Sequence, residues 1–433
     1  MNAVTIVGAG LAGCEAAWQL VKQGIPVHLI EMKPKRFSPA HSMEGFGELV
    51  CSNSLKAEHL TNGSGLLKAE MESFDSLVLS AAQTARVPAG GALAVDRARF
   101  SKILTDTLTN HPLVIVSHEI VEDMPDAPVI ITTGPLTDET LANTIAGLPG
   151  CERLHFFDAA APIVTRESLD MSCIFPASRY GKGGGEDYLN CPMDEAQYNA
   201  FYEALLAAEL NEPHGFEKKL VFEGCLAVEI LASRGRQTLA FGPLKPIGLT
   251  DPKTGKTPYA VVQLRQDNEA GTLYNLVGFQ TRLKWGEQKR VFSMIPGLEH
   301  AEFVRYGVMH RNTYLNSPDV LGRNYALAND PLTRFAGQIT GVEGYVESAA
   351  SGLVAGLSLG RVLQGKKDID FGTETMLGAL ECHVRTKTGN FQPMNANFGI
   401  LPSLPMRVKG KQARYEKLSE RALSVIEGLV SNP

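Results

Sequence analysis

The glycine pattern at the start of this chain strongly limits what the first residues can form. A short apolar run, 4–7, has the composition of a strand, and Gly8, Gly10 and Gly13 follow it in G-x-G-x-x-G spacing. Gly8 permits a tight turn, Gly10 lets the backbone approach a pyrophosphate, and Gly13 allows the following helix to pack closely on the strand. The N-terminus of that helix offers free N–H groups to an anion. The pattern therefore predicts a βαβ unit that binds a dinucleotide.

An acidic residue supports this interpretation. A second apolar run, 26–30, ends at Glu31, about 20 residues beyond the glycines, where a carboxylate would hydrogen-bond a ribose hydroxyl. The residues predicted to bind the cofactor in this half of the site are Gly8, Ala9, Gly10, Leu11, Ala12, Gly13 and Glu31.

A second glycine-rich segment near the other end of the chain distinguishes between cofactors. The run 335–345 leads into a helical pattern of small residues, 347–363, and an earlier strand, 128–132, leads into a Thr-Gly step. Glycines are costly inside a helix, so we expect this helix to lie close to a sheet or a flavin. The further predicted cofactor residues are Gly134, Gly337, Gln338, Gly341, Gly344 and Tyr345. A simple NAD dehydrogenase needs no such segment, so FAD is predicted, with NAD(P)H docking only transiently.

The length of the chain and a change in residue composition along it predict the domain organisation. With 433 residues the chain is long enough for two domains. We expect an α/β fold, with a Rossmann-like FAD-binding domain of the glutathione-reductase type at 1–165 and 320–433, interrupted by an α+β insertion that holds the substrate at 166–319. Other expected elements are helices at 66–81, 97–108 (capped by Asp96) and 194–210, and strands at 113–121 and 226–231.

Composition excludes some classes of protein. The formal net charge of −6 argues against a nucleic-acid binder that is basic over its whole surface, although a local basic patch remains compatible with it. No run approaches the ~18 apolar residues of a membrane span, and no signal peptide is visible, so we expect a cytoplasmic protein. The 7 cysteines show no zinc spacing, which favours reduced thiols and no metal site.

Five segments together resemble one family. VGAGLAGCEAA, ELVCSNSLK, VPAGGALAVDR, VFEGC and AGQITGVEGYVESAASGLVAG look like the folate- and FAD-dependent tRNA (uracil-5-)-methyltransferases, over nearly the full length. The resemblance implies that methylenetetrahydrofolate donates a carbon, that NAD(P)H provides the electrons, and that 5-methyluridine forms at position 54 in the T-arm of tRNA, with release of tetrahydrofolate. No obligate protein partner is implied. The alternatives are an MnmG-type flavoprotein acting with a GTPase at the wobble uridine, a small-molecule flavin oxidoreductase, and a non-enzymatic FAD scaffold.

The chemistry of such a reaction explains two of the cysteines. C5 of uracil is a poor nucleophile until a group adds to C6, and a thiolate suits that step. The target base must also leave its stack. The resemblance implies Cys51 and Cys225 as the catalytic pair and leaves open which of them adds to C6. Cys51 lies in a polar, turn-forming context that predicts partial exposure, whereas Cys14, Cys151, Cys173, Cys191 and Cys382 are expected to be buried and inert.

Secondary candidates complete the predicted site. With the resemblance, His310 is a candidate for stacking on the folate, and His41 for tuning the Cys51 thiolate. Phosphate contacts with tRNA require positive charge. The candidate clusters are Arg179 with Lys182, then Arg282, Lys284, Lys289 and Arg290, and finally Arg407, Lys409, Lys411 and Arg414.

Overall fold

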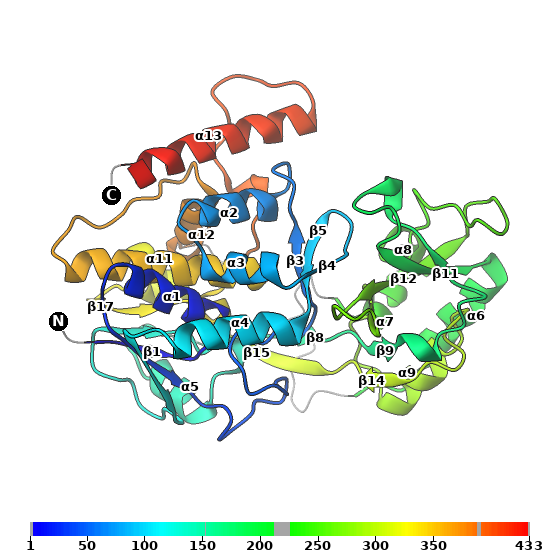
Figure 1. The fold of residues 1–433 in the computed structure, drawn as a ribbon, viewed down its shortest axis with the longest axis horizontal. Helices are drawn as coiled ribbons and strands as arrows, with labels where there is room; N and C mark the ends of the chain where they lie inside the picture. The colour runs from blue at the N-terminus through cyan, green and yellow to red at the C-terminus, as the bar shows by residue number, and fades with distance from the viewer. Residues whose placement is uncertain (1–2, 152, 212–225, 388–390, 432–433) are drawn as a thin grey trace.

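The chain forms a larger and a smaller domain that lie side by side (Figure 1). The computed structural model describes residues 3–151, 153–211, 226–387 and 391–431. Both ends of the chain belong to the larger domain, and the middle of the chain forms the smaller one. The predicted α/β class, with an α+β insertion, is confirmed. The predicted boundaries near residues 165 and 320 stay a prediction.

The central sheet of the larger domain combines strands from both ends of the chain. Its order is β16-β17-β7-β1-β2-β6, with all neighbours parallel except β16. The strands are β1 (Val4–Val7), β2 (Val27–Glu31), β6 (Val114–His118), β7 (Val129–Ile131), β16 (Ala326–Leu327) and β17 (Asp330–Phe335). Val7 pairs with Ile131, which pairs with Phe335, so the carboxyl ends of the three strands meet at one edge. Ligands of open α/β sheets bind at this edge.

Two helices pack against each other at unusually short range. Helix α1 (Leu11–Lys22) contacts α11 (Tyr345–Leu363), and a Cβ on Gly352 would lie 2.1 Å from the carbonyl oxygen of Ala12. The start of α11 lines the cavity described below, whereas its interior glycines Gly352 and Gly356 permit close packing on α1. In the described residues α11 is also long and apolar enough to cross a membrane by length and composition, but 72% of its most apolar window is buried inside the protein.

The larger domain also contains further helices and a second, small sheet. They are α2 (Gly63–Glu72), α3 (Leu77–Thr84), α4 (Arg97–Thr109), α5 (Glu139–Ala146), α10 (Ser317–Val320), α12 (Met376–Arg385), α13 (Lys411–Ser431) and a small antiparallel sheet of β3 (Ser54–Ala57), β5 (Ala92–Val95) and β4 (Arg86–Val87). The Asp96 cap is confirmed, since its side chain accepts from Arg99 N at 2.9 Å. The single helix predicted at 66–81 is wrong. Asp75 adopts a φ of 50°, and Ser76 caps a new helix.

The smaller domain has its own sheet and its own core. Its order is β10-β11-β12-β13-β9-β14, entirely antiparallel. The strands are β9 (Ile163–Thr165), β10 (Phe175–Pro176), β11 (Tyr188–Met193), β12 (Ala260–Gln266), β13 (Leu273–Leu276) and β14 (Phe303–Arg305), and the helices are α6 (Glu195–Leu206), α7 (Val228–Ser233), α8 (Arg236–Phe241) and α9 (Trp285–Phe292). The strand predicted at 226–231 is wrong, because most of it belongs to α7. There the buried Glu229 accepts hydrogen bonds from Thr281 and Arg282.

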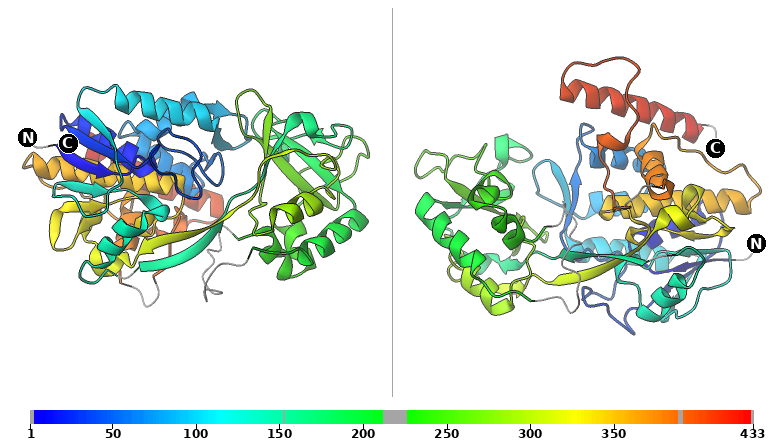
Figure 2. Two further views of the ribbon diagram at one scale, coloured as in Figure 1. Left: turned by 90° about the horizontal axis from the view of Figure 1, so that it is seen from below. Right: turned by 180° about the vertical axis from the view of Figure 1, so that it is seen from behind.

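A two-stranded ribbon connects the domains. Strands β8 (Arg153–Ala159) and β15 (Met309–Leu315) pair antiparallel over their whole length. Seen from below, they run from the larger domain toward the smaller one (Figure 2). The ribbon thus carries the chain into the insertion and back.

Candidate functional site

A cavity opens at the carboxyl edge of the central sheet. Among the predicted cofactor residues, those that line it are Gly8, Ala9, Gly10, Leu11, Ala12, Glu31, Gly134, Gln338, Gly337 and Tyr345, and Gly13, Gly341 and Gly344 lie outside the lining. Residues of β1 and β2, the two threonines directly after β7 and the start of α11 contribute to the same wall. The topology therefore brings together segments from both ends of the chain.

The glycine loop has the geometry that a pyrophosphate requires. Gly8 has a φ of +99°, and a Cβ on Gly13 would lie 1.9 Å from the carbonyl oxygen of Gly8, so neither position accepts a side chain without rearrangement. At Gly10 no atom lies within 4 Å of a Cβ position, which leaves the backbone open. Helix α1 has no side-chain cap and no acidic residue in its first turn. Its N-terminus can therefore receive an anion.

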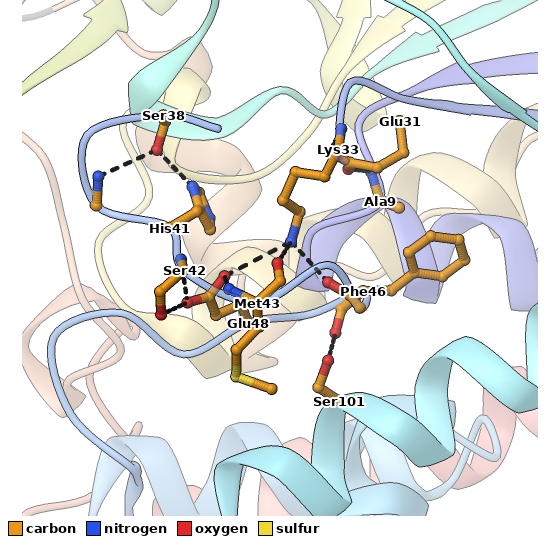
Figure 3. Close-up of polar contacts among 12 residues, drawn as sticks. Ala9, Glu31, Lys33, Ser38, His41, Ser42, Met43, Phe46, Glu48 and Ser101 are labelled. Atoms are coloured by element: carbon orange, nitrogen blue, oxygen red, sulfur yellow. Dashed lines mark hydrogen bonds and ion pairs between the residues drawn. The ribbon is translucent and has the colours of Figure 1, made fainter. Parts of the chain in front are cut away.

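Buried charges shape the segment 33–48 beside this cavity (Figure 3). Glu31 accepts hydrogen bonds from Ala9 N at 2.8 Å and Lys33 N at 3.0 Å. The Lys33 ammonium donates to the carbonyl of Gly45 at 2.6 Å and lies 3.7 Å from the Glu48 carboxylate. The side chains of Lys33 and Glu48 are 5% and 2% exposed. Sequence analysis missed this pair, because nothing local connects the two residues.

His41 lines the cavity within the same segment. Its Nδ1 lies 2.5 Å from Ser38 Oγ. Burial lowers its pKa, and the neighbouring Lys33 charge lowers it further, so the neutral imidazole is favoured. Its predicted effect on Cys51 stays a prediction.

Cys51 contacts the first residue of α11. The Tyr345 hydroxyl lies 3.0 Å from Cys51 Sγ and accepts from Cys51 N at 2.8 Å and from Ser52 N at 3.3 Å. Tyr345 lines the cavity, and Cys51 is half-buried, as its polar context predicts. The structure therefore places this thiol beside the wall of the dinucleotide cavity.

An arginine of the smaller domain contacts the two residues that follow Cys51. Arg265, on β12 of the smaller domain, donates to Ser52 Oγ at 2.7 Å and to Asn53 Oδ1 at 2.9 Å. Its burial lowers its pKa, while the charge of Cys51 raises it. Arg97 lies 3.2 Å from Asp267. Positive neighbours favour the thiolate form of a cysteine. Sequence analysis missed Arg265, although a charged residue inside the apolar run of β12 was an available signal.

Two predicted residues cannot be placed in this site. Cys225 lies outside the described residues. His310 belongs to β15, where the backbone pairs with Asp158, and its side chain is outside the description. Among the other cysteines, Cys14, Cys151 and Cys191 are buried as predicted, whereas Cys173 and Cys382 are half-buried, so the prediction for those two is wrong. Cys173 lies in a turn, with its N–H bonded to the Asp170 carbonyl.

The first two basic clusters are largely engaged within the protein. Arg179 donates to Gln263 Oε1 at 2.9 Å, which turns it inward. Lys284 pairs with Glu209 at 2.7 Å, and Arg290 pairs with Glu287 at 2.6 Å. The two ion pairs reduce the positive charge that the second cluster can offer to phosphates.

The third basic cluster is more open. Arg407, Lys409, Lys411 and Arg414 are exposed at and before the start of α13. Lys411 Nζ and the Arg414 guanidinium lie 5.5 Å and 5.4 Å from the ring centre of Tyr415. Of the predicted clusters, this one keeps most of its charge accessible to solvent.

Comparisons with known proteins identify the family. Residues 3–367 match the family described as Glucose inhibited division protein A. Proteins of Staphylococcus aureus strains Newman and N315, both named methylenetetrahydrofolate--tRNA-(uracil-5-)-methyltransferase TrmFO, are 57% identical to the chain over 98% of each sequence. The chain belongs to the TrmFO family. Aquifex aeolicus GidA shares the fold at a TM-score of 0.70 and 15% identity, over 99% of this chain and 73% of the GidA chain.

Proposed function

We propose that this protein transfers a one-carbon unit from methylenetetrahydrofolate to C5 of a uridine in the T-arm of tRNA, at position 54, in the cytoplasm. FAD is its cofactor and NAD(P)H its reductant. Two things support the proposal: the activity named for relatives that are 57% identical, and the contact of 3.0 Å between the Cys51 thiol and the Tyr345 hydroxyl beside the dinucleotide cavity. The contact carries the proposal, because it brings a nucleophile to the cofactor wall.

The residues of the cavity fit FAD. The open backbone at Gly10 and the uncapped N-terminus of α1 suit a pyrophosphate, and Glu31 suits a ribose hydroxyl. Gly337, Gln338 and Tyr345 would hold the opposite end of the cofactor. When bound, FAD supplies the reducing equivalents that complete the methyl group.

The chain's own residues supply the acid, the base and the nucleophile. Cys51 and Cys225 form the proposed pair. One thiolate adds to C6 of the uracil, which makes C5 nucleophilic, and the other acts in proton transfer or protects the cofactor. The Tyr345 hydroxyl and the Arg265 charge favour the thiolate form of Cys51. After the carbon has been transferred, C5 loses its proton and the thiolate leaves C6.

The test uses tRNA that lacks 5-methyluridine. We expect the FAD-loaded protein to form 5-methyluridine, detected by nucleoside mass spectrometry, only when both methylenetetrahydrofolate and NAD(P)H are present. Cys51→Ala should lose this activity and keep bound FAD. Cys173→Ala is the matched control, because that thiol is half-buried in the other domain and should keep full activity. Equal product from Cys51→Ala, or none from the unmodified protein, would contradict the proposal.

The MnmG-type alternative rests on the family match of residues 3–367 and on the shared fold. The GidA likeness is at 15% identity, whereas the methyltransferase relatives align over 98% of both sequences. A stable complex with a GTPase and modification at the wobble uridine would favour that alternative over ours.

A further inference from the structure

Three aromatic rings form a ladder at the edge of the smaller domain. Trp285, the first residue of α9, stacks on Tyr306 with ring centres 5.7 Å apart and planes at 14°. Tyr306 stacks in turn on Phe303 at 5.3 Å and 13°. Phe303 contacts Phe292, which is fully buried, whereas Trp285 is 61% exposed. The ladder is thus anchored in the core and ends at a largely exposed indole.

The support of the ladder is rigid. The Gln288 side chain, one turn along α9 from Trp285, donates to the Gly307 carbonyl at 2.8 Å and accepts from Gly307 N at 2.7 Å. Gln288 is fully buried. The start of α9 and the segment beside Tyr306 are therefore fixed to each other, and β14 and α9 lie side by side (Figure 1). An exposed ring on such a support loses little entropy when it binds a ligand.

The position of the ladder connects it to the site. Arg305 is the residue next to Tyr306, and adjacent Cα atoms are only about 3.8 Å apart. Arg305 ends β14, and the sheet of β14 also contains β12, where Arg265 donates to Ser52 Oγ at 2.7 Å, next to Cys51. The ladder therefore begins at the end of a strand whose sheet also reaches the segment of Cys51.

The charges near Trp285 select the kind of ligand. Lys284 and Arg290 are paired with Glu209 and Glu287, so this surface offers an aromatic face more than free positive charge. Phosphates of a duplex need accessible cations, whereas an unpaired base can stack on an aromatic side chain. An acidic peptide would meet the same neutralised charges.

We propose that Trp285 is a stacking platform for an unpaired base of the RNA substrate. The inference rests on the proposed function, because a tRNA substrate is what brings unpaired bases to this surface. The base extends the ladder on the outer face of the indole and thereby positions the loop next to Cys51. Nothing in the transfer chemistry requires Trp285, so its effect falls on RNA binding.

The experiment uses the two tryptophans of the chain, Trp18 and Trp285. In the variant Trp18→Phe, Trp285 is the only indole fluorophore. We expect an RNA stem-loop with the T-arm sequence to quench its fluorescence as it binds to the FAD-loaded protein. Trp285→Ala should weaken binding of the stem-loop about 10-fold, since stacking of a base on an aromatic side chain is worth about that factor or more. Trp285→Phe should recover part of the affinity. Neither Trp285→Ala nor Trp285→Phe should change the amount of bound FAD or the melting temperature.

Three results would overturn the inference. The first is binding of the stem-loop with unchanged Trp285 fluorescence and unchanged affinity of Trp285→Ala. That result leaves the proposed function intact. The second is equal quenching by a blunt duplex without a loop, which would exclude an unpaired base. The third is the absence of both RNA binding and 5-methyluridine formation by the unmodified protein, which would remove the proposed function together with the inference.

Discussion

Replacing Tyr345 with phenylalanine should make the Cys51 thiol less reactive. The hydroxyl oxygen of Tyr345 accepts hydrogen bonds from Cys51 N and Ser52 N, at 2.8 Å and 3.3 Å, which occupies both of its lone pairs. Its proton is then directed to Cys51 Sγ, 3.0 Å away. Burial and the nearby charge of Cys51 raise the pKa of Tyr345 well above its usual range, so the hydroxyl stays protonated. Tyr345 therefore donates to the thiolate.

The size of the effect follows from that hydrogen bond. A hydrogen bond to a charged group contributes about 1.5–3 kcal/mol, and each 1.4 kcal/mol is about a factor of ten. Tyr345→Phe removes this donor and leaves the apolar ring in place. The thiolate fraction of Cys51 near pH 7 should therefore fall about 10- to 100-fold.

Peptide-resolved alkylation measures this fraction. Iodoacetamide is added for timed intervals at pH 7, and the labelling rate of Cys51 is compared between the unmodified protein and Tyr345→Phe. Cys173, which is half-buried in the smaller domain, is the reference within each sample. An unchanged Cys51 rate, with the Cys173 rate also unchanged, would refute the reasoning. A change in both rates would indicate a general loosening of the fold instead.

Three further predictions concern the cofactor and stability. Glu31→Ala should weaken FAD retention at least about 10-fold, measured by flavin absorbance after dialysis, because a charged hydrogen-bond acceptor at the cavity is lost. Gly352→Val should lower the free energy of unfolding, measured in urea, by about 1–3 kcal/mol or more, since its Cβ would lie 2.1 Å from the Ala12 oxygen. The control Gly428→Ala has no atom within 4 Å of its Cβ position and should raise the free energy of unfolding by up to about 1 kcal/mol. Burial raises the pKa of Glu70 to about 8, so the folded state binds more protons than the unfolded state, and stability present below pH 4.5 should be lost as the pH rises through 8. Urea titrations between pH 5 and 8 should show that the free energy of unfolding of Glu70→Gln rises relative to that of the unmodified protein by about 1 kcal/mol per pH unit. Plots of this free energy against pH that run parallel for the two proteins would contradict the prediction.

The elements that sequence analysis predicted well are those specified by local chemistry. Gly8 and Gly13 mark the turn from β1 into α1, and Asp96 marks the start of α4, because each position requires a particular backbone conformation or cap. Local chemistry did not specify the structure of region 226–231, where a strand was predicted and most residues belong to α7. Its apolar run fits a strand or a helix, and the hydrogen bonds of Glu229 to residues far along the chain stabilise the helix.

Contacts between residues far apart in the sequence could not be predicted from local sequence patterns. The Cys51–Tyr345 contact joins residues 294 positions apart, and neither residue carries a local sign of the other. The same holds for Lys33 and Glu48, whose charges are tolerated in the interior only because the folded loop pairs them. The cysteine and the tyrosine were each predicted as site residues, but their direct contact appears only in the three-dimensional arrangement.

The pairing of β17 with β7 has a consequence for how the protein is made. A nascent chain that has emerged from the ribosome only through the smaller domain holds β1, β2 and β7 but lacks β17 and the start of α11. The coenzyme then has no second wall to bind, and the apolar edge of β7 stays unpaired and open to association with other chains. Flavin uptake is therefore a late event in biogenesis, and translation products that terminate before α11 should aggregate rather than accumulate as apoprotein.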